Sequence, residues 1–321
     1  MNVRVAATGL LPPRELEITR ARPLLGTLVE IAATGRDAAR VNEAIARAFE
    51  QIDRVHRLMS FHDPASDVSR INRDASASPV SVHEDTWQVL TMARDVAEVS
   101  RGLFDITIAP VLAAYEYLPC HPEFPKPSDQ GDWRHVELLP GRLVRLARCL
   151  QIDLGGIAKG YAVDLAIGSL QTSGMSAGRV NAGGDLRVFG AATQTIRVRH
   201  PLDAAITVPL MRVRNGAMAT SATYFSAKLQ CGRWISPLIH PLSRASCGAG
   251  ISVSVVAEDC MTADALTKVV HADPAGAPAL LECYGASAVM LDMDPTTGGS
   301  RMTHTEGGQW RVAALSEGGD E

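Results

Sequence analysis

Apolar residues between Asp37 and Met59 recur at intervals of three or four positions, and this spacing predicts an amphipathic helix with Asp37 as its N-cap. The residues that share its apolar stripe are Val41, Ile45, Ala48, Ile52, Val55 and Met59. Other helical patterns cover residues 84–100, 158–171, 263–271 (with Thr262 as the cap) and 278–284. Residues 60–74 are mostly polar, and we expect them to form a loop between the first two helices.

Short apolar runs predict β-strands, most of them in the second half of the chain. They cover residues 28–31, 179–181, 195–199, 206–214, 250–256, 287–291 and 310–314, with two more strands in 136–153 around Pro140-Gly141. Helices and strands do not alternate strictly, which favours an α+β fold over a doubly wound sheet. The helical first half and the strand-rich second half suggest two lobes with a cleft between them.

Composition and charge exclude several classes of protein. Apolar residues make up 46% of the 321 residues and charged residues 21%, as in ordinary globular proteins. The net charge of −4 and the aromatic content of 5% disfavour a nucleic-acid-binding surface. The longest uncharged stretches have 13 residues, such as 215–227, whereas a membrane-spanning helix needs about 20 mostly apolar residues. We therefore expect neither a nucleic-acid partner nor a membrane-spanning segment.

The N-terminal residues do not resemble a secretory signal, because the neutral stretch from Val5 to Pro13 is short and ends in two prolines. The six cysteines include no closely spaced pair of the kind that binds zinc, and scattered cysteines in a chain with a large core are typical of reduced thiols. We expect a cytoplasmic protein.

Two glycine pairs are candidates for ligand contact. Gly155-Gly156 precedes a predicted helix, and such a turn lets backbone approach an anion at the helix N-terminus, with Lys159 close by. An ordinary tight turn explains this pair equally well. The second pair, Gly183-Gly184, is followed by Asp185, and there an ordinary turn is the more common explanation.

Two acidic positions also have alternative explanations. Asp264 lies three and four positions before Thr267 and Lys268, so one helix face could offer oxygens to a hard cation. Alternatively, Asp264 only favours the helix dipole. Asp105 lies within an apolar run, where burial requires hydrogen bonds, so it is either a structural anchor or a site residue.

Taken in order, these segments resemble the FAD:protein FMN transferases, the ApbE family. The similar stretches are 25–27, 59–61, 66–72, 102–105, 153–164, 180–185, 219–221 and 263–266. The run Asp-Leu-Gly-Gly-Ile-Ala-Lys-Gly-Tyr-Ala-Val-Asp at 153–164 is highly specific. The resemblance implies a mixed fold with short, largely antiparallel strands, flanking helices and an active-site cleft between lobes. We expect this domain to cover residues 23–315, after an N-terminal extension (1–22) and before a flexible tail (316–321).

The resemblance also implies an activity. Family members transfer the FMN moiety of FAD to a Ser or Thr hydroxyl of an acceptor flavoprotein, with Mg²⁺, and release AMP. The expected partners are therefore FAD and an acceptor protein with a Ser/Thr flavinylation site. Hydrolysis of FAD to FMN and AMP, or flavin binding without chemistry, are the alternatives.

By the same resemblance, the metal site comprises the Asp264 carboxylate, the Gly156 carbonyl and Thr267, and the residues nearest the reaction are Asp264, Lys268 and His240. The residues expected to contact FAD are Leu25, His62, Leu103, Phe104, Asp105, Asp153, Lys159 and Ile239. Lys159 would pair with a phosphate, and Leu25 and Phe104 would offer apolar surface to the flavin.

The sequence departs from the family pattern at three places. Lys268 stands where a Thr is common, and an ammonium group cannot ligate Mg²⁺. We therefore expect Thr267 to supply the hydroxyl and Lys268 to contact the FAD pyrophosphate. The motif His-Ile-Ile-Asp-Pro is replaced by Pro-Leu-Ile-His-Pro at 237–241, so that its His is lost and His240 takes the Asp position. Leu25 replaces the usual Met.

Overall fold

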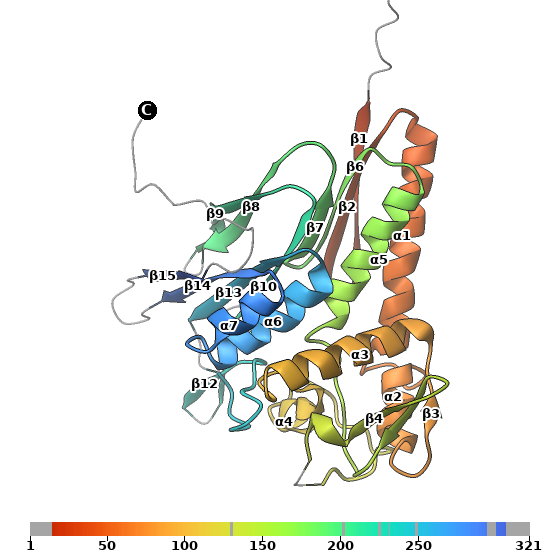
Figure 1. Ribbon diagram of the computed structural model, residues 1–321, viewed down its shortest axis with the longest axis vertical. Coiled ribbons are helices and arrows are strands. Elements are labelled where there is room, and N and C mark those ends of the chain that lie inside the picture. The colour runs from red at the N-terminus through yellow and green to blue at the C-terminus, as the bar shows by residue number, and fades with distance from the viewer. Residues whose placement is uncertain are drawn as a thin grey trace, which may run out of the picture.

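The computed structural model describes residues 15–305, except 129–130, 201–202, 224–225, 231, 248–249 and 294–299. Its centre is an eight-stranded sheet in the order β1-β2-β6-β7-β10-β13-β14-β15, in which every neighbouring pair is antiparallel (Figure 1). The strands are β1 (Leu16–Leu24), β2 (Thr27–Gly35), β6 (Ala177–Ala182), β7 (Asp185–Phe189), β10 (Gly216–Ala222), β13 (Ile251–Ala257), β14 (Ser287–Met293) and β15 (Ser300–Thr305). With the helices below, this sheet confirms the predicted α+β class.

One face of the sheet is covered by α1 (Ala38–Met59), α5 (Ala158–Thr172) and α6 (Cys260–Ala272), which pack side by side (Figure 1). The predicted apolar stripe of α1 is buried, and the Asp37 side chain accepts hydrogen bonds from the Ala39 and Arg40 amides. Helix α7 (Ala277–Cys283) packs on α6 and β14. A separate apolar cluster joins the hairpin of β8 (Gln194–His200) and β9 (Asp203–Val213) to β7, through Leu186 and Val188. Because side chains alternate along a strand, Asp185 and Arg187 face the helices instead.

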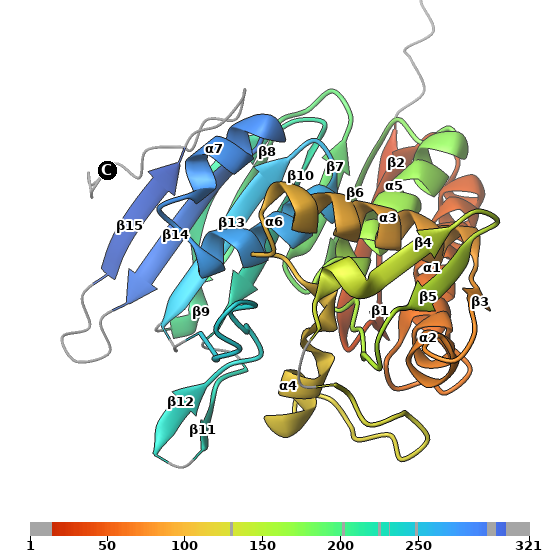
Figure 2. The same ribbon diagram turned by 60° about the horizontal axis from the view of Figure 1, so that its bottom comes forward.

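The remaining elements lie beyond the lower end of the helix layer in the view of Figure 1. They are α2 (Asp67–Asp74), α3 (Glu84–Val99), α4 (Ala109–Ala114), the 3₁₀ turns η1 (Ile106–Ile108) and η2 (Trp133–His135), and a three-stranded sheet of β3 (Val80–Ser81), β5 (Leu143–Leu146) and β4 (Val136–Leu139). A hairpin of β11 (Lys228–Gln230) and β12 (Arg233–Ile235) projects near α4 (Figure 2).

Helix α2 corrects the expected loop at 60–74. Three of its polar residues, Asp67, Ser69 and Asn72, are buried, and the side chains of all three are hydrogen-bonded. Asn72 exchanges two hydrogen bonds with the Ile152 backbone, at 2.7 and 2.9 Å, and Asp67 accepts from the His83 amide and the Thr86 hydroxyl. A polar composition therefore indicated a loop where tertiary contacts stabilise a helix.

Two boundaries also differ from those expected. Helix α6 begins at Cys260, because its N-cap is Asp259, whose side chain accepts from the Thr262 amide at 2.8 Å. Residues 16–22, assigned above to an extension, form most of β1 and pair with β2 over their whole length. This edge strand is largely exposed, so it lacks the apolar alternation that marks a half-buried strand. The strand expected at 310–314 and the tail at 316–321 lie outside the described residues.

Gly160 in α5 allows α6 to approach closely, since an added Cβ would lie 2.3 Å from the Cys260 carbonyl oxygen. We expect Gly160→Ala to lower the free energy of unfolding by about 1–3 kcal/mol through overpacking, measured by urea denaturation. Gly168→Ala in the same helix is the control, because no atom lies within 4 Å of its added Cβ. That variant should be about 0.5–1 kcal/mol more stable than the wild type. Equal effects of the two substitutions would contradict the close approach.

Candidate active site

Two sharp turns bring distant motifs together at one end of the large sheet. The β1–β2 turn consists of Leu25 and Gly26, both with positive φ (54° and 70°), as a two-residue hairpin turn requires. The β6–β7 turn contains Gly183, where φ is 66° and an added Cβ would lie 2.5 Å from Thr27 Oγ1. An added Cβ at Gly184 would contact Thr220 at the end of β10. The motifs at 25–27, 181–185 and 219–221 are therefore neighbours.

Beside these turns, two aspartates and two lysines form a charged cluster. Asp264 is fully buried on α6, and its Oδ2 accepts the Gly160 amide at 3.2 Å and lies 3.6 Å from Lys159 Nζ. Its Oδ1 accepts from the Lys268 ammonium. Lys159 also forms an ion pair with Asp185, which is 2% exposed. Two carboxylates and two ammonium groups thus balance one another.

Burial and the neighbouring charges shift the pKa values of three groups in this cluster, Asp264, Lys159 and Asp185. Burial raises the pKa of Asp264, but the ammonium groups of Lys159 and Lys268 outweigh it and hold that pKa below its usual value. Burial lowers the pKa of Lys159, but the carboxylates of Asp185 and Asp264 leave it above its usual value. The pKa of Asp185 is raised by burial and by the charge of Asp264, an effect that Lys159 partly offsets.

Asp164 holds the beginning of α6 against α5. Its two carboxylate oxygens accept the Cys260 and Met261 amides at 2.9 and 2.8 Å, and Arg187 on β7 donates to Oδ1 at 2.8 Å. Burial raises the pKa of Asp164 to about 6, although Arg187 lowers it in part. Because Asp264 lies one turn further along α6, this anchor sets where its carboxylate stands.

The structure brings together the three residues predicted to hold a metal. An added Cβ on Gly156 would lie 3.3 Å from Lys268 Cε, and Asp264 and Thr267 are on the adjoining turn of α6. Thr267 is fully buried; its hydroxyl donates to the Asp264 carbonyl oxygen, and the Ser221 hydroxyl lies 2.7 Å from it. The Thr267 hydroxyl therefore has two protein partners in this arrangement, and its role as a metal ligand stays a prediction.

These residues do not fit a divalent cation in this arrangement. Lys268 Nζ donates to both Asp264 Oδ1 and the Asp264 carbonyl oxygen, the latter at 3.0 Å, so its positive charge lies at the oxygens that a metal would need. Both carboxylates of the cluster are already neutralised by lysines. Nor does any group of three His, Cys, Asp or Glu residues suited to a metal occur in the described part of the chain.

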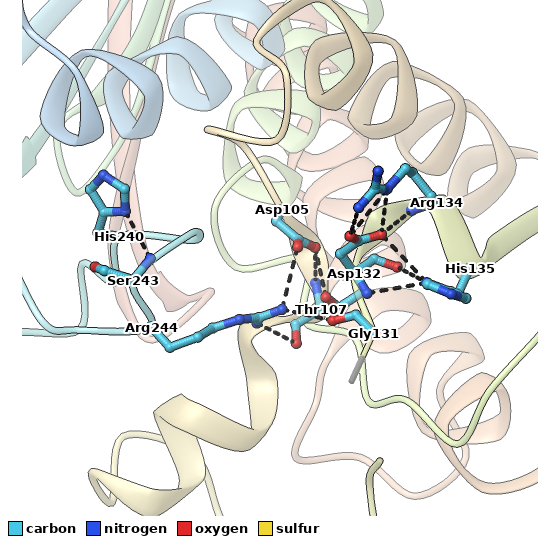
Figure 3. Close-up of polar contacts among 9 residues, drawn as sticks. All are labelled: Asp105, Thr107, Gly131, Asp132, Arg134, His135, His240, Ser243 and Arg244. Carbon is cyan, nitrogen blue, oxygen red and sulfur yellow. Dashed lines mark hydrogen bonds and ion pairs between the residues drawn. The ribbon is translucent and has the colours of Figure 1, made fainter. Parts of the chain in front are cut away.

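Asp105 has a structural contact set that favours the anchor interpretation of its side chain. Its Oδ1 accepts from both the amide and the hydroxyl of Thr107 at 2.8 Å, and Arg244 Nη2 lies 3.6 Å from its Oδ2 (Figure 3). Burial raises the pKa of Asp105, and the hydrogen bonds from Thr107 and the charge of Arg244 lower it in part. Next to it, Asp132 caps η2 and pairs with Arg134 (Figure 3).

Arg244 is the residue that the sequence analysis missed. Its guanidinium donates to the Thr107 carbonyl at 3.2 Å and to the Gly131 carbonyl at 2.9 Å, which ties the segment 236–247 to two loops more than a hundred residues away (Figure 3). Arg244 has a φ of 56°, an uncommon conformation for a residue other than glycine. Its sequence gives no local signal, because an arginine in a polar turn is ordinarily solvated.

The other predicted site residues belong either to the surroundings of the charged cluster or to the segment that Arg244 anchors. Phe104 is buried next to Gly156, and Asp153 accepts the Gly155 amide at 3.1 Å. Burial raises the pKa of Asp153, while the charges of His62 and Lys159 lower it in part. His62 is exposed, and Leu25 and Leu103 are partly buried against the main apolar core.

Ile239 and His240 belong to the segment that Arg244 anchors. Ile239 is buried, and His240 Nδ1 accepts the Ser243 amide at 3.3 Å within its own turn (Figure 3). Among the described residues, no polar contact joins His240 to the charged cluster. The two described surface pockets, around Phe49 and around Met175, contain none of the predicted site residues. The active-site cleft between lobes stays a prediction.

Comparison with known proteins agrees with the motifs. The model of the ApbE family matches residues 25–290. A Vibrio cholerae relative named FAD:protein FMN transferase is 26% identical over 273 residues, covering 80% of this chain and 81% of the relative. A Rhodobacter capsulatus relative of the same name is 27% identical over 288 residues and 84% of this chain, which spans about half (54%) of that protein. The crystal structure of the ApbE protein from Thermotoga maritima is 26% identical, with a TM-score of 0.78 over 90% of this chain and 97% of that one.

This chain belongs to the ApbE family, and the resemblance drawn from its motifs is confirmed. Within the part of the chain that the structure describes, no helix has the length and apolarity needed to cross a membrane.

Lys159 tests the balance of charge in the cluster. We expect Lys159→Ala to lower the free energy of unfolding by about 3 kcal/mol, because it leaves Asp185 and Asp264 as buried carboxylates that share one ammonium. Urea denaturation measures this loss. Arg47→Ala, which removes an exposed ion pair with Glu43 on α1, is the control and should cost less than about 1 kcal/mol. Unchanged stability with weaker FAD binding would instead favour a lysine that faces phosphate alone.

His271 follows Lys268 on α6 and is 9% exposed. Its Nε2 donates to the Ser221 carbonyl at 3.1 Å, while its buried Nδ1 has no partner among the described atoms. Burial, together with the charge of Lys268, lowers the pKa of His271 to about 4, although the bond to Ser221 raises it in part. The imidazole is therefore neutral in the folded protein at neutral pH.

This neutral histidine predicts a pH-dependent stability. Between pH 6.5 and 4 the unfolded chain binds a proton at His271 that the folded chain does not, so this residue lowers stability by about 3 kcal/mol as the pH falls through that range. Asp164, with its raised pKa, acts in the opposite direction. We therefore compare the wild type with His271→Gln at each pH. The stability advantage of the wild type should shrink on acidification; a constant difference would refute the lowered pKa.

Proposed function

We propose that this chain transfers the FMN moiety of FAD to a hydroxyl group of an acceptor protein and releases AMP. The observation that carries the proposal is the meeting of the family motifs around the two ammonium groups of Lys159 and Lys268, which stand next to the beginning of α5. The names of the Vibrio and Rhodobacter relatives support the same activity.

The beginning of α5 suits the pyrophosphate of FAD. Ile157, the N-cap of this 15-residue helix, makes no side-chain hydrogen bond to the first turn, so the first amides are not capped by its own side chain. The Ala158 and Gly160 amides already donate to the Leu154 carbonyl and to Asp264, so the attraction for a further anion comes from the positive end of the helix dipole and from the two lysines. The side chains of Lys159 and Lys268 are 32% and 21% exposed, so part of each is accessible from solvent.

In the proposed reaction the acceptor hydroxyl oxygen attacks the phosphorus atom of the FMN half of FAD. A new P–O bond forms, the bond from this phosphorus to the bridging oxygen breaks, and AMP leaves with that oxygen while the hydroxyl proton is released. The negative charge that accumulates on the phosphate oxygens and the leaving group is stabilised by the lysine ammonium groups. Most of the catalysis then comes from binding and orientation.

The other contacts are assigned to the ends of FAD. Leu103, Phe104 and Leu25 offer apolar surface to the flavin, and Ile239 and His240 approach from the segment that Arg244 anchors. Serine or threonine is the acceptor residue that we propose. The proposed reaction does not include the Mg²⁺ ion implied by the family, because the Lys268 ammonium donates to the oxygens of Asp264 that would ligate it. The cytoplasmic location stays a prediction.

Incubation with FAD and an extract of the source organism tests the proposal. We expect AMP release together with flavin fluorescence on a protein band that survives denaturing electrophoresis, and mass spectrometry should place the FMN on a Ser or Thr. AMP and free FMN without acceptor would indicate a pyrophosphatase instead. Bound FAD without AMP would indicate a flavin-binding protein without chemistry. The matched control is the same extract without the enzyme.

A further inference from the structure

We infer that the Lys268 ammonium takes the place of the divalent cation in this chain, so that its binding and use of FAD require no divalent metal. The inference deepens the proposed function and rests on it for the identity of the ligand. Two observations support it: the position of the Lys268 side chain, and the balance of charges among Asp185, Asp264, Lys159 and Lys268.

Lys268 Nζ bonds two oxygens of Asp264, the carboxylate Oδ1 and the main-chain carbonyl, and its Cε lies beside Gly156. The ammonium group therefore occupies the space between the residues predicted to hold the metal. The spacing of four residues on α6 places Lys268 there, because side chains at i and i+4 lie on one helix face.

Before FAD binds, the charges of the protein groups disfavour a divalent ion next to the Lys268 ammonium. Asp185 and Asp264 contribute two negative charges, and Lys159 and Lys268 neutralise both. A divalent ion added to this set would leave the cluster with a charge of +2 and would lie next to the ammonium group that already bonds Asp264. Burial of the carboxylates makes that repulsion large, because water does not screen it.

Lys268 also keeps a donor for the substrate. An ammonium group has three N–H donors, and two of them point to Asp264. No acceptor for the third is described in this structure, and the side chain is 21% exposed. A phosphate oxygen of FAD that accepts this N–H would gain a charge-assisted hydrogen bond in place of coordination to a metal ion.

The experiment uses the full chain, with three measurements in EDTA and in Mg²⁺: FAD affinity, AMP release, and Mn²⁺ binding followed by the electron paramagnetic resonance of free Mn²⁺. In the wild type, FAD affinity and AMP release should change less than twofold between EDTA and Mg²⁺, and Mn²⁺ should stay free. Lys268→Thr should bind Mn²⁺, and its FAD affinity should become at least tenfold weaker in EDTA than in Mg²⁺.

Lys268→Met and Lys126→Thr complete the set. The methionine removes the charge without supplying a ligand, so its FAD affinity should fall about tenfold or more in both conditions, the loss of one charge-assisted hydrogen bond. Lys126 is an exposed lysine outside the cluster, and Lys126→Thr should behave like the wild type. A thermal melt confirms that each variant is folded.

The inference is overturned if the wild type binds Mn²⁺ and loses tenfold or more of its FAD affinity in EDTA, since Lys268 would then move aside for a metal. This outcome is distinct from failure of the proposed function. A wild type that releases no AMP in either condition contradicts the transfer reaction, whereas its FAD affinity and Mn²⁺ binding still decide which cation the site uses.

Discussion

The candidate site depends on the burial of the Asp264 carboxylate. A carboxylate with no exposed surface is stable only where each oxygen meets a donor. Two helices meet this demand: α5 offers the Gly160 amide and Lys159, and α6 offers Lys268. Strand β7 adds Asp185, which balances the charge of Lys159. None of these elements can shift without leaving a charge unpaired, so the requirement of one carboxylate fixes the relative positions of two helices and a strand.

The family motif at 153–164 contributes packing and chemistry from the same helical turns. Lys159 faces the charged cluster, while its neighbour Gly160 has no side chain and so lets the backbone of α6 come close. One turn later, Asp164 bonds the first amides of α6 and Arg187 of β7. Much of this motif therefore serves the packing of α6 on α5, although its specificity suggests ligand binding along its whole length.

A second anchor joins the rest of the site. Arg244 bridges Asp105, Thr107 and Gly131, and so holds the segment of Ile239 and His240 against the loop that carries Phe104. The family resemblance assigned Asp105 to FAD, yet its carboxylate is occupied by Thr107 and faces Arg244. Its side chain takes part in the contacts that link three distant stretches of chain, and its contact with FAD stays a prediction.

Local patterns in the sequence were sufficient for the long helices, for the family, and for four of the eight strands of the large sheet, β2, β6, β13 and β14. Periodicity identified α1 and α3, and the i, i+4 spacing already placed Lys268 beside Asp264. The sequence pattern did not reveal α2, the edge strand β1 or the role of Arg244, because their polar side chains are explained only by distant partners or by an exposed edge. The pairing of Lys159 with Asp185 and Asp264 was also not predicted, because both partners are distant in the sequence. Residues 26 and 105 positions apart along the chain meet only once the helices have packed on the sheet, and that packing decides which charges neutralise one another.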